Sequence, residues 1–245
     1  MSKVRRFRVE TLLNVGVGDA LILPPEELRH ARVLRLDHDA PIELFDNTGR
    51  SASAVLTATA GELAARILSV EESRTSTHRL AIAAAWPKGK RSSVMVEKCS
   101  ELGLDRLIPI HYTHSVVTKD DEAEGVARLR RIAVEAAKQS GRNEPLQIAA
   151  EITFAQALAQ EVPSTLALMA EPRAEASLVD ILQAERSNIV SRSVLIFIGP
   201  EGGYSAEELA QGKAHGLRQV KLARNVLRVE TAAIAACSIT RAVLD

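Results

Sequence analysis

A glycine-rich turn follows a strongly apolar segment in the C-terminal half of the chain. Residues 196–205 read Ile-Phe-Ile-Gly-Pro-Glu-Gly-Gly-Tyr-Ser, and the spacing of Ser205 and Glu208 predicts a capping box that opens a helix. Glycines let the backbone approach a ligand closely, and ligands of open α/β sheets bind at the carboxyl ends of strands. The spacing matches neither a dinucleotide-binding fingerprint nor a P-loop. It predicts either a small-molecule site, in which the Glu201 carboxylate attracts a cation, or a plain strand–helix turn.

A second segment combines a basic and an acidic residue just before a helix. Residues 220–232 read Val-Lys-Leu-Ala-Arg-Asn-Val-Leu-Arg-Val-Glu-Thr-Ala, so a strand ends at Leu222, a loop follows and a helix begins near Glu230. An acidic residue at a helix start suits the helix macrodipole. Arg228 therefore either serves a site beside the apolar residues that precede it or forms a surface ion pair with Glu230.

Basic residues gather at several other places, and basic charge suits phosphate. A polar helix end with a glycine cap occupies residues 138–145, a basic turn occupies 86–91, and His30 stands with two arginines in 30–35. The alternative interpretation of each of these three segments is an ordinary surface segment whose charges contact only water. The six histidines are scattered without metal-ligand spacing, so no metal site is expected. No serine nucleophile elbow is present either.

The elements that position these residues differ between the two parts of the chain. In the first part, short strands at a spacing of about ten residues indicate a small β-barrel with one helix. The expected strands are 7–10, 20–23, 41–45, 52–57 and 62–70, and the expected helix begins at residues 24–27 and carries its apolar face up to residue 34.

From residue 79 onward, strand-like and helix-like segments alternate, which predicts a parallel sheet with helices on both faces. Strands are expected at 80–85, 106–110, 165–169, 193–198 and 219–222, and helices at 92–102, 123–140, 153–160, 177–184, 205–216 and 230–244. The polar residues 73–78 form the expected linker between domains 1–72 and 79–245.

Composition excludes a disordered chain, a collagen and a coiled coil as descriptions of the whole protein. The 245 residues are 46% hydrophobic and 25% charged, which is ordinary for a globular protein. Lysine and arginine number 31 and so do aspartate and glutamate, so net charge does not by itself indicate nucleic acid. Two cysteines, a charged N-terminus and the lack of a long apolar run indicate a cytoplasmic protein that does not cross a membrane.

Taken together and in this order, the segments resemble the RsmE-type 16S ribosomal RNA uridine methyltransferases, a family of the SPOUT class. The resemblance extends over essentially the whole chain and depends chiefly on Gly-Pro-Glu-Gly-Gly at 199–203 and Val-Leu-Arg-x-Glu-Thr-Ala at 226–232. Shorter matches are Arg-Arg-Phe at 5–7, His-x-Arg-Val-Leu-Arg at 30–35, Phe-Asp at 45–46, Lys-Gly at 88–89, Glu-Lys-x-x-Glu-Leu-Gly at 97–103 and Gln-Ser-Gly-Arg at 139–142.

The resemblance implies a fold and an activity. It implies a PUA-like RNA-binding β-barrel in residues 1–72 and an α/β domain with a deep trefoil knot in residues 79–245. It also implies a homodimer that binds S-adenosylmethionine (SAM) in the knot. The implied reaction is methylation of N3 of a specific uridine in 16S rRNA, with the assembled 30S subunit as the expected acceptor.

The resemblance also assigns residues to roles. The implied SAM contacts are Met169, Ile198, Gly199, Pro200, Glu201, Gly202, Gly203, Leu222, Ala223, Asn225, Val226 and Leu227. The basic residues expected to contact RNA are Arg5, Arg6, Arg8, His30, Arg32, Arg35, Lys88, Lys90 and Arg91.

The acceptor nitrogen must lose its proton before it can accept a methyl group. Negative charge then spreads to the ring oxygens, where a fixed cation would stabilise it. Arg228 matches the family position for such a cation, and Arg142 is a second candidate that would reach across a dimer interface. Glu230 is a candidate base, although a carboxylate paired with arginine is the simpler role.

Some residues depart from the family pattern. Ala223-Arg224-Asn225 stands where Gly-Pro-Arg is usual, Val229 stands where Thr is usual, and Glu97 stands where Gln is usual. Two alternatives stay open. One is a SPOUT enzyme that modifies another RNA, at a tRNA base or a ribose; the PUA-like first part with His-x-Arg-Val-Leu-Arg at 30–35 is the feature that discriminates against it. The other is a non-catalytic RNA-binding or ribosome-assembly factor, which the change at 223–225 keeps open.

Overall fold

The computed structural model describes residues 4–46, 48–59, 62–72, 78–115, 122–163, 165–189 and 193–245, which fall into two compact units. The first unit comprises residues 1–75 together with 137–145, and the second comprises 76–136 and 146–245. The division lies within the expected linker 73–78, most of which is outside the described residues. The inclusion of residues 137–145 in the first unit is not predictable from the order of the sequence.

A five-stranded sheet and one helix make up most of the first unit. The strands are β1 (Arg5–Arg8), β2 (Ala20–Ile22), β3 (Pro41–Phe45), β4 (Arg50–Thr59) and β5 (Glu62–Glu72), in the spatial order β1-β3-β4-β5-β2. Among the pairings of these strands, that of β1 with β3 is parallel and the others are antiparallel. Helix α1 (Pro25–Val33) begins with Pro25, whose missing N–H costs nothing at that position. The core of this unit includes Phe7, Leu44 and Leu56, all fully buried.

A parallel sheet forms the centre of the second unit. Its path runs β12-β10-β11-β6-β7-β8, with β9 also pairing with β7. The strands are β6 (Leu80–Ala85), β7 (Arg106–His111), β8 (Gln147–Ile148), β9 (Ile152–Thr153), β10 (Thr165–Ala170), β11 (Ser193–Ile198) and β12 (Arg218–Val220). Every pairing between them is parallel, as the alternation of elements predicted.

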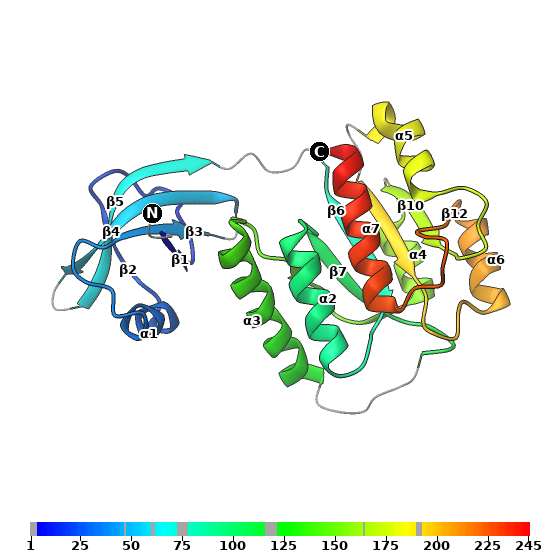
Figure 1. The fold of residues 1–245 in the computed structure, drawn as a ribbon, viewed down its shortest axis with the longest axis horizontal. Coiled ribbons are helices and arrows are strands. Elements are labelled where there is room, and N and C mark those ends of the chain that lie inside the picture. Colours follow the sequence, from blue (N-terminus) through cyan, green and yellow to red (C-terminus); the bar gives the residue numbers. More distant parts are fainter. Residues whose placement is uncertain are drawn as a thin grey trace. The chain divides into compact units, whose positions relative to one another are not determined.

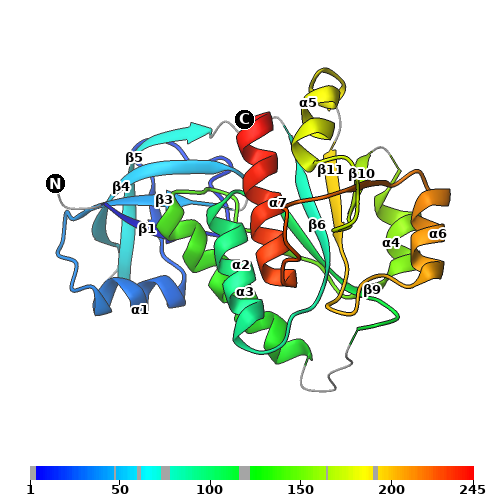
Figure 2. The same ribbon diagram turned by 45° about the vertical axis from the view of Figure 1, so that its right-hand side comes forward.

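Helices cover both faces of this sheet (Figures 1 and 2). They are α2 (Lys90–Glu101), α3 (Glu122–Ser140), α4 (Phe154–Glu161), α5 (Leu178–Ile189), α6 (Ala206–Ala214) and α7 (Val229–Leu244). Helix α7 packs against α2 and α5, and α4 packs against α6 on the opposite face. Across the part of the chain that the structure describes, the helices are each too short or too polar to traverse a lipid bilayer.

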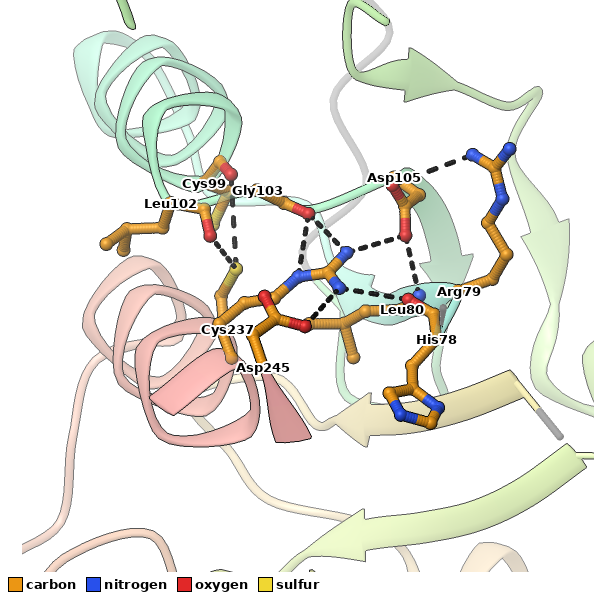
Figure 3. A network of polar contacts seen from close by, with 10 residues as sticks. His78, Arg79, Leu80, Cys99, Leu102, Gly103, Asp105, Cys237 and Asp245 are labelled. Atoms are coloured by element: carbon orange, nitrogen blue, oxygen red, sulfur yellow. Dashed lines mark hydrogen bonds and ion pairs between the residues drawn. The ribbon is translucent and has the colours of Figure 1, made fainter. Parts of the chain in front are cut away.

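A polar network fixes the C-terminal end of α7 (Figure 3). The Arg241 guanidinium donates to the carbonyl of Gly103, at 3.0 and 2.6 Å, and to that of His78 at 2.9 Å. It also lies 2.7 Å from Oδ2 of Asp105, which accepts from the backbone N–H of Leu80. One side chain thereby holds the C-terminal end of α7 against the end of α2 and the start of β6.

Candidate functional site

Two loops at the carboxyl ends of parallel strands enclose a cavity in the second unit. One follows β11 and the other follows β12, and the cavity of about 680 Å³, part of it open to solvent, also reaches the first turns of α7. Its lining residues are Ala170, Glu171, Pro172, Ile198, Gly199, Pro200, Glu201, Gly203, Tyr204, Leu222, Ala223, Asn225, Val226, Leu227, Val229 and Ala232. The volume suits a small organic ligand.

Most of the residues expected to contact a cofactor lie in this lining. Met169 and Gly202 do not: Met169 is buried, and its Cε lies 2.8 Å from where a Cβ on Gly212 would stand. Ala170, the next residue along β10, takes the place expected of Met169 at the cavity. Gly202 faces His114 instead, because a Cβ added to this glycine would stand 3.1 Å from the histidine Cβ.

The turn after β11 is shaped by close packing and by a positive backbone angle. A Cβ on Gly199 would lie 3.0 Å from Cζ of Tyr204, so the aromatic ring covers the glycine directly. Gly203 has φ of 74°, a conformation that L-residues rarely adopt. Burial, and then the nearby charge of Glu171, raises the pKa of the Tyr204 phenol, which therefore stays protonated.

Helix α6 begins with the predicted capping box and ties a further loop to the site. Ser205 Oγ accepts from the N–H of Glu208, and the Glu208 carboxylate accepts from the N–H of Ser205 at 2.7 Å. The same carboxylate accepts from the N–H and hydroxyl of Thr113, at 2.8 and 3.1 Å. Burial alone would raise the pKa of Glu208, but these hydrogen bonds outweigh it and lower the pKa below its ordinary value.

The loop before α7 places the expected catalytic residues at one border of the cavity. Arg228 is the exposed N-cap residue of α7, and it lies between the lining residues Leu227 and Val229. Glu230 is only 8% exposed, and its Oε2 has no hydrogen-bond partner among the described residues. The surface ion pair between Arg228 and Glu230 that the sequence allowed is not formed by these described side chains.

The expected RNA contacts differ in their exposure and pairing. Arg5, Arg32, Arg35, Lys88 and Lys90 are exposed, Arg8 and His30 are half-buried, and Arg91 pairs with Glu201 of the glycine-rich turn at 3.2 Å.

Arg6 is a correction to the expected set of RNA contacts. Its side chain is 8% exposed, pairs with Glu43 at 3.0 Å, and donates to the carbonyls of Ala137 and Arg142 and to the side chain of Asn143. Its guanidinium also stacks over Phe45, 4.7 Å from the ring centre. A guanidinium paired and buried in this way holds the first unit together and exposes little surface to a phosphate.

Arg142 belongs by its contacts to the first compact unit, and the cavity belongs to the second. The catalytic role expected of Arg142 therefore stays a prediction. Sequence reasoning also missed lining residues, notably Glu171, Pro172 and Tyr204. The rule that ligands bind where parallel strands end would have found Glu171, which directly follows β10. Within the described residues, no group of three or more His, Cys, Asp or Glu side chains could hold a metal ion.

Comparisons with known proteins show the family of the chain. The chain is 31% identical to ribosomal RNA small subunit methyltransferase E of Synechocystis sp., over 87% of this chain and 70% of that protein. It is 30% identical to the protein of the same name from Mycobacterium tuberculosis, over 94% of this chain and 88% of that protein.

Solved structures give the same result. The crystal structure of ribosomal RNA small subunit methyltransferase E from Neisseria gonorrhoeae bound to S-adenosyl methionine has a TM-score of 0.85 and 29% identity, covering 96% of this chain and 95% of that one. A methyltransferase from Legionella pneumophila in complex with SAM has a TM-score of 0.84 and 28% identity, covering 98% of both chains. Residues 74–241 match the RNA methyltransferase domain family. The chain therefore belongs to the RNA methyltransferase family that includes ribosomal RNA small subunit methyltransferase E.

Proposed function

We propose that this protein transfers a methyl group from SAM to N3 of a specific uridine in the 16S rRNA of the small ribosomal subunit. The observation that carries the proposal is the cavity between the turn at 199–203 and the loop at 222–227, in a chain whose structural relatives were solved with SAM bound. Both family-defining segments, distant in sequence, contribute to that one cavity.

The lining fits the chemistry of SAM. Ile198, Leu222 and Leu227 offer apolar walls, and the backbone N–H and C=O groups of the glycine-rich turn can read the edge of an adenine ring. When bound there, SAM supplies a methyl group on a positively charged sulfonium. The lining residues hold that donor in place and exclude water around it.

The acceptor uridine needs help from a cation. As the N3 proton leaves, negative charge develops on the ring oxygens, and the proposed cation that stabilises it is Arg228, which is exposed and lies between two lining residues. Glu230 has a buried oxygen without a hydrogen-bond partner among the described residues, which makes it the candidate to take the proton or to orient the base. Arg142 is proposed as a second cation, supplied by the partner subunit of a homodimer.

The remaining parts of the proposal concern the fold and the setting. The five-stranded sheet is proposed to close as a PUA-like barrel that binds RNA through its exposed arginines, and the α/β unit to contain the trefoil knot of the SPOUT class. The acceptor is proposed to be the assembled 30S subunit in the cytoplasm, because a protein without net charge has little attraction for naked RNA.

Transfer of labelled methyl from SAM to three acceptors tests this proposal. The acceptors are 30S subunits that lack the modification, naked 16S rRNA and total tRNA. We expect label in the 30S subunits and much less in the other two. Label in tRNA alone would replace the proposal with that of a SPOUT enzyme for another RNA, and SAM binding without transfer to any acceptor would favour a non-catalytic factor.

A further inference from the structure

The charged residues that line the cavity are all acidic. They are Glu171 and Glu201, and no lysine, arginine or histidine is among the described lining residues. Glu201 is exposed, and its charge is opposed by Arg91 at 3.2 Å. Glu171 has no such opposing cation among the described side chains; one of its oxygens accepts from the backbone N–H of Arg173 at 3.2 Å. The cavity thus presents one uncompensated carboxylate to a ligand.

Glu171 is held in place by the sheet. It directly follows β10, and its N–H donates to the carbonyl of Val220 at 2.9 Å, so its backbone is fixed between β10 and the end of β12. The charge of Glu171 acts inside the cavity. Burial is the main cause of the raised pKa of the lining residue Tyr204, and the negative charge of Glu171 is the second. A carboxylate that is fixed, partly shielded from water and unpaired attracts a cation more strongly than one at the surface.

We propose that Glu171 makes the cavity favour a ligand whose sulfur carries a positive charge over one whose sulfur is neutral. This inference rests on the proposed function. During transfer the bond between sulfur and the methyl carbon breaks, the bond between N3 and that carbon forms, and the sulfur keeps the electron pair. SAM, with a sulfonium, thereby becomes S-adenosylhomocysteine, with a neutral thioether. The cavity consequently holds the donor more tightly than the product, which assists product release.

Calorimetric titration of three ligands into wild-type protein and two variants tests the inference. The ligands are SAM, S-adenosylhomocysteine and sinefungin, whose amine places positive charge near the sulfur position. The variants are Glu171→Gln, which keeps the acceptor for the Arg173 N–H, and Glu175→Gln. Glu175 is a matched control because it is exposed, lies in the same segment and does not line the cavity.

We expect Glu171→Gln to lower the affinity for SAM and for sinefungin by about tenfold and to leave the affinity for S-adenosylhomocysteine nearly unchanged. Glu175→Gln should change none of the three affinities. Equal weakening of all three ligands would overturn the inference, because Glu171 would then contact a part that they share. No effect of Glu171→Gln on any ligand would overturn it as well. If the wild-type protein bound none of the ligands, the proposed function itself would fail and the inference with it.

Discussion

Arg228 is the cation that the structure places at the border of the cavity, between two residues that line it. Because Arg228 is exposed and does not line the cavity itself, its removal leaves the walls of the cavity intact. We expect Arg228→Ala to lower kcat for methyl transfer by roughly 100- to 1000-fold, since a donor aimed at developing charge acts mainly in the transition state. The affinity for SAM, measured by calorimetry, should stay close to that of the wild type.

Arg224→Ala is the matched control for that prediction. Arg224 is exposed on the same loop but is not a lining residue. The Arg224→Ala variant should therefore keep kcat for methyl transfer near the wild-type value. Similar losses of kcat in the two variants would mean that the loop needs general positive charge and not a cation at residue 228.

Gly199 tests how closely the cavity wall is packed. Its φ is not in the positive region, so an added methyl group causes no backbone strain, but it would stand 3.0 Å from the ring of Tyr204. The ring must move, and overpacking of this kind costs about 1–3 kcal/mol. We expect Gly199→Ala to weaken SAM binding by about tenfold. Gly125→Ala, where a Cβ meets open space, should leave SAM binding unchanged.

At the scale of elements, the capping box of α6 also anchors a loop from another part of the sheet. Glu208 accepts hydrogen bonds from Ser205 and Thr113, so it joins the start of α6 to the loop after β7. Charged hydrogen bonds of this kind contribute about 1.5–3 kcal/mol each. We expect Glu208→Gln to lower the free energy of unfolding by about 2 kcal/mol at neutral pH.

The pH dependence of that loss has a definite sign. The pKa of Glu208 is lower in the folded protein than its ordinary value. The contribution of its carboxylate to the free energy of unfolding is therefore present at neutral pH and disappears as the pH falls through the lowered pKa. Urea unfolding should show the gap between wild type and Glu208→Gln closing as the pH is lowered. Glu207→Gln, an exposed neighbour in the same turn, should show little gap at any pH. A gap that stays constant in acid would contradict the assignment.

Several elements were predictable because local rules determine them. Strands β3, β6 and β11 begin and end where their apolar runs predicted, and Ser205 with Glu208 forms the predicted cap of α6. Strand β12 ends two residues earlier than predicted, and the two-residue strands β8 and β9 were not anticipated. Such short strands carry little pattern of their own and form because β7 pairs with them.

At the scale of the whole molecule, sequence order does not decide which residues pack together. The last residues of α3 and the turn that follows it, 137–145, join the first unit. Arg6 donates to the carbonyls of Ala137 and Arg142, and Lys138 Nζ lies 2.6 Å from the buried Glu27. Arginines near an N-terminus resemble an RNA-binding arm in the sequence. Only the partners in space show that Arg6 is an interior residue, whereas Arg5 next to it is exposed.

This difference between neighbouring arginines gives a prediction about stability. Arg6→Ala removes several charged hydrogen bonds and should lower the free energy of unfolding of the first unit by about 2–3 kcal/mol. Arg6→Lys should rescue little, because an ammonium cannot reproduce the forked contacts of a guanidinium. Arg5→Ala should leave stability unchanged. Thermal unfolding measures all three, and a stable Arg6→Ala protein with weakened RNA binding would restore Arg6 as an RNA contact.

Identification of the product nucleoside tests the proposed reaction without any intermediate assumption. The 30S subunits from cells that lack the modification are incubated with the protein and SAM, and their 16S rRNA is digested to nucleosides for mass spectrometry. We expect one new nucleoside, 3-methyluridine, at one position per subunit, and its near-absence with Arg228→Ala. A methyl group found on another base, on a ribose or on no nucleoside of 16S rRNA would mean that the protein does not catalyse the proposed reaction.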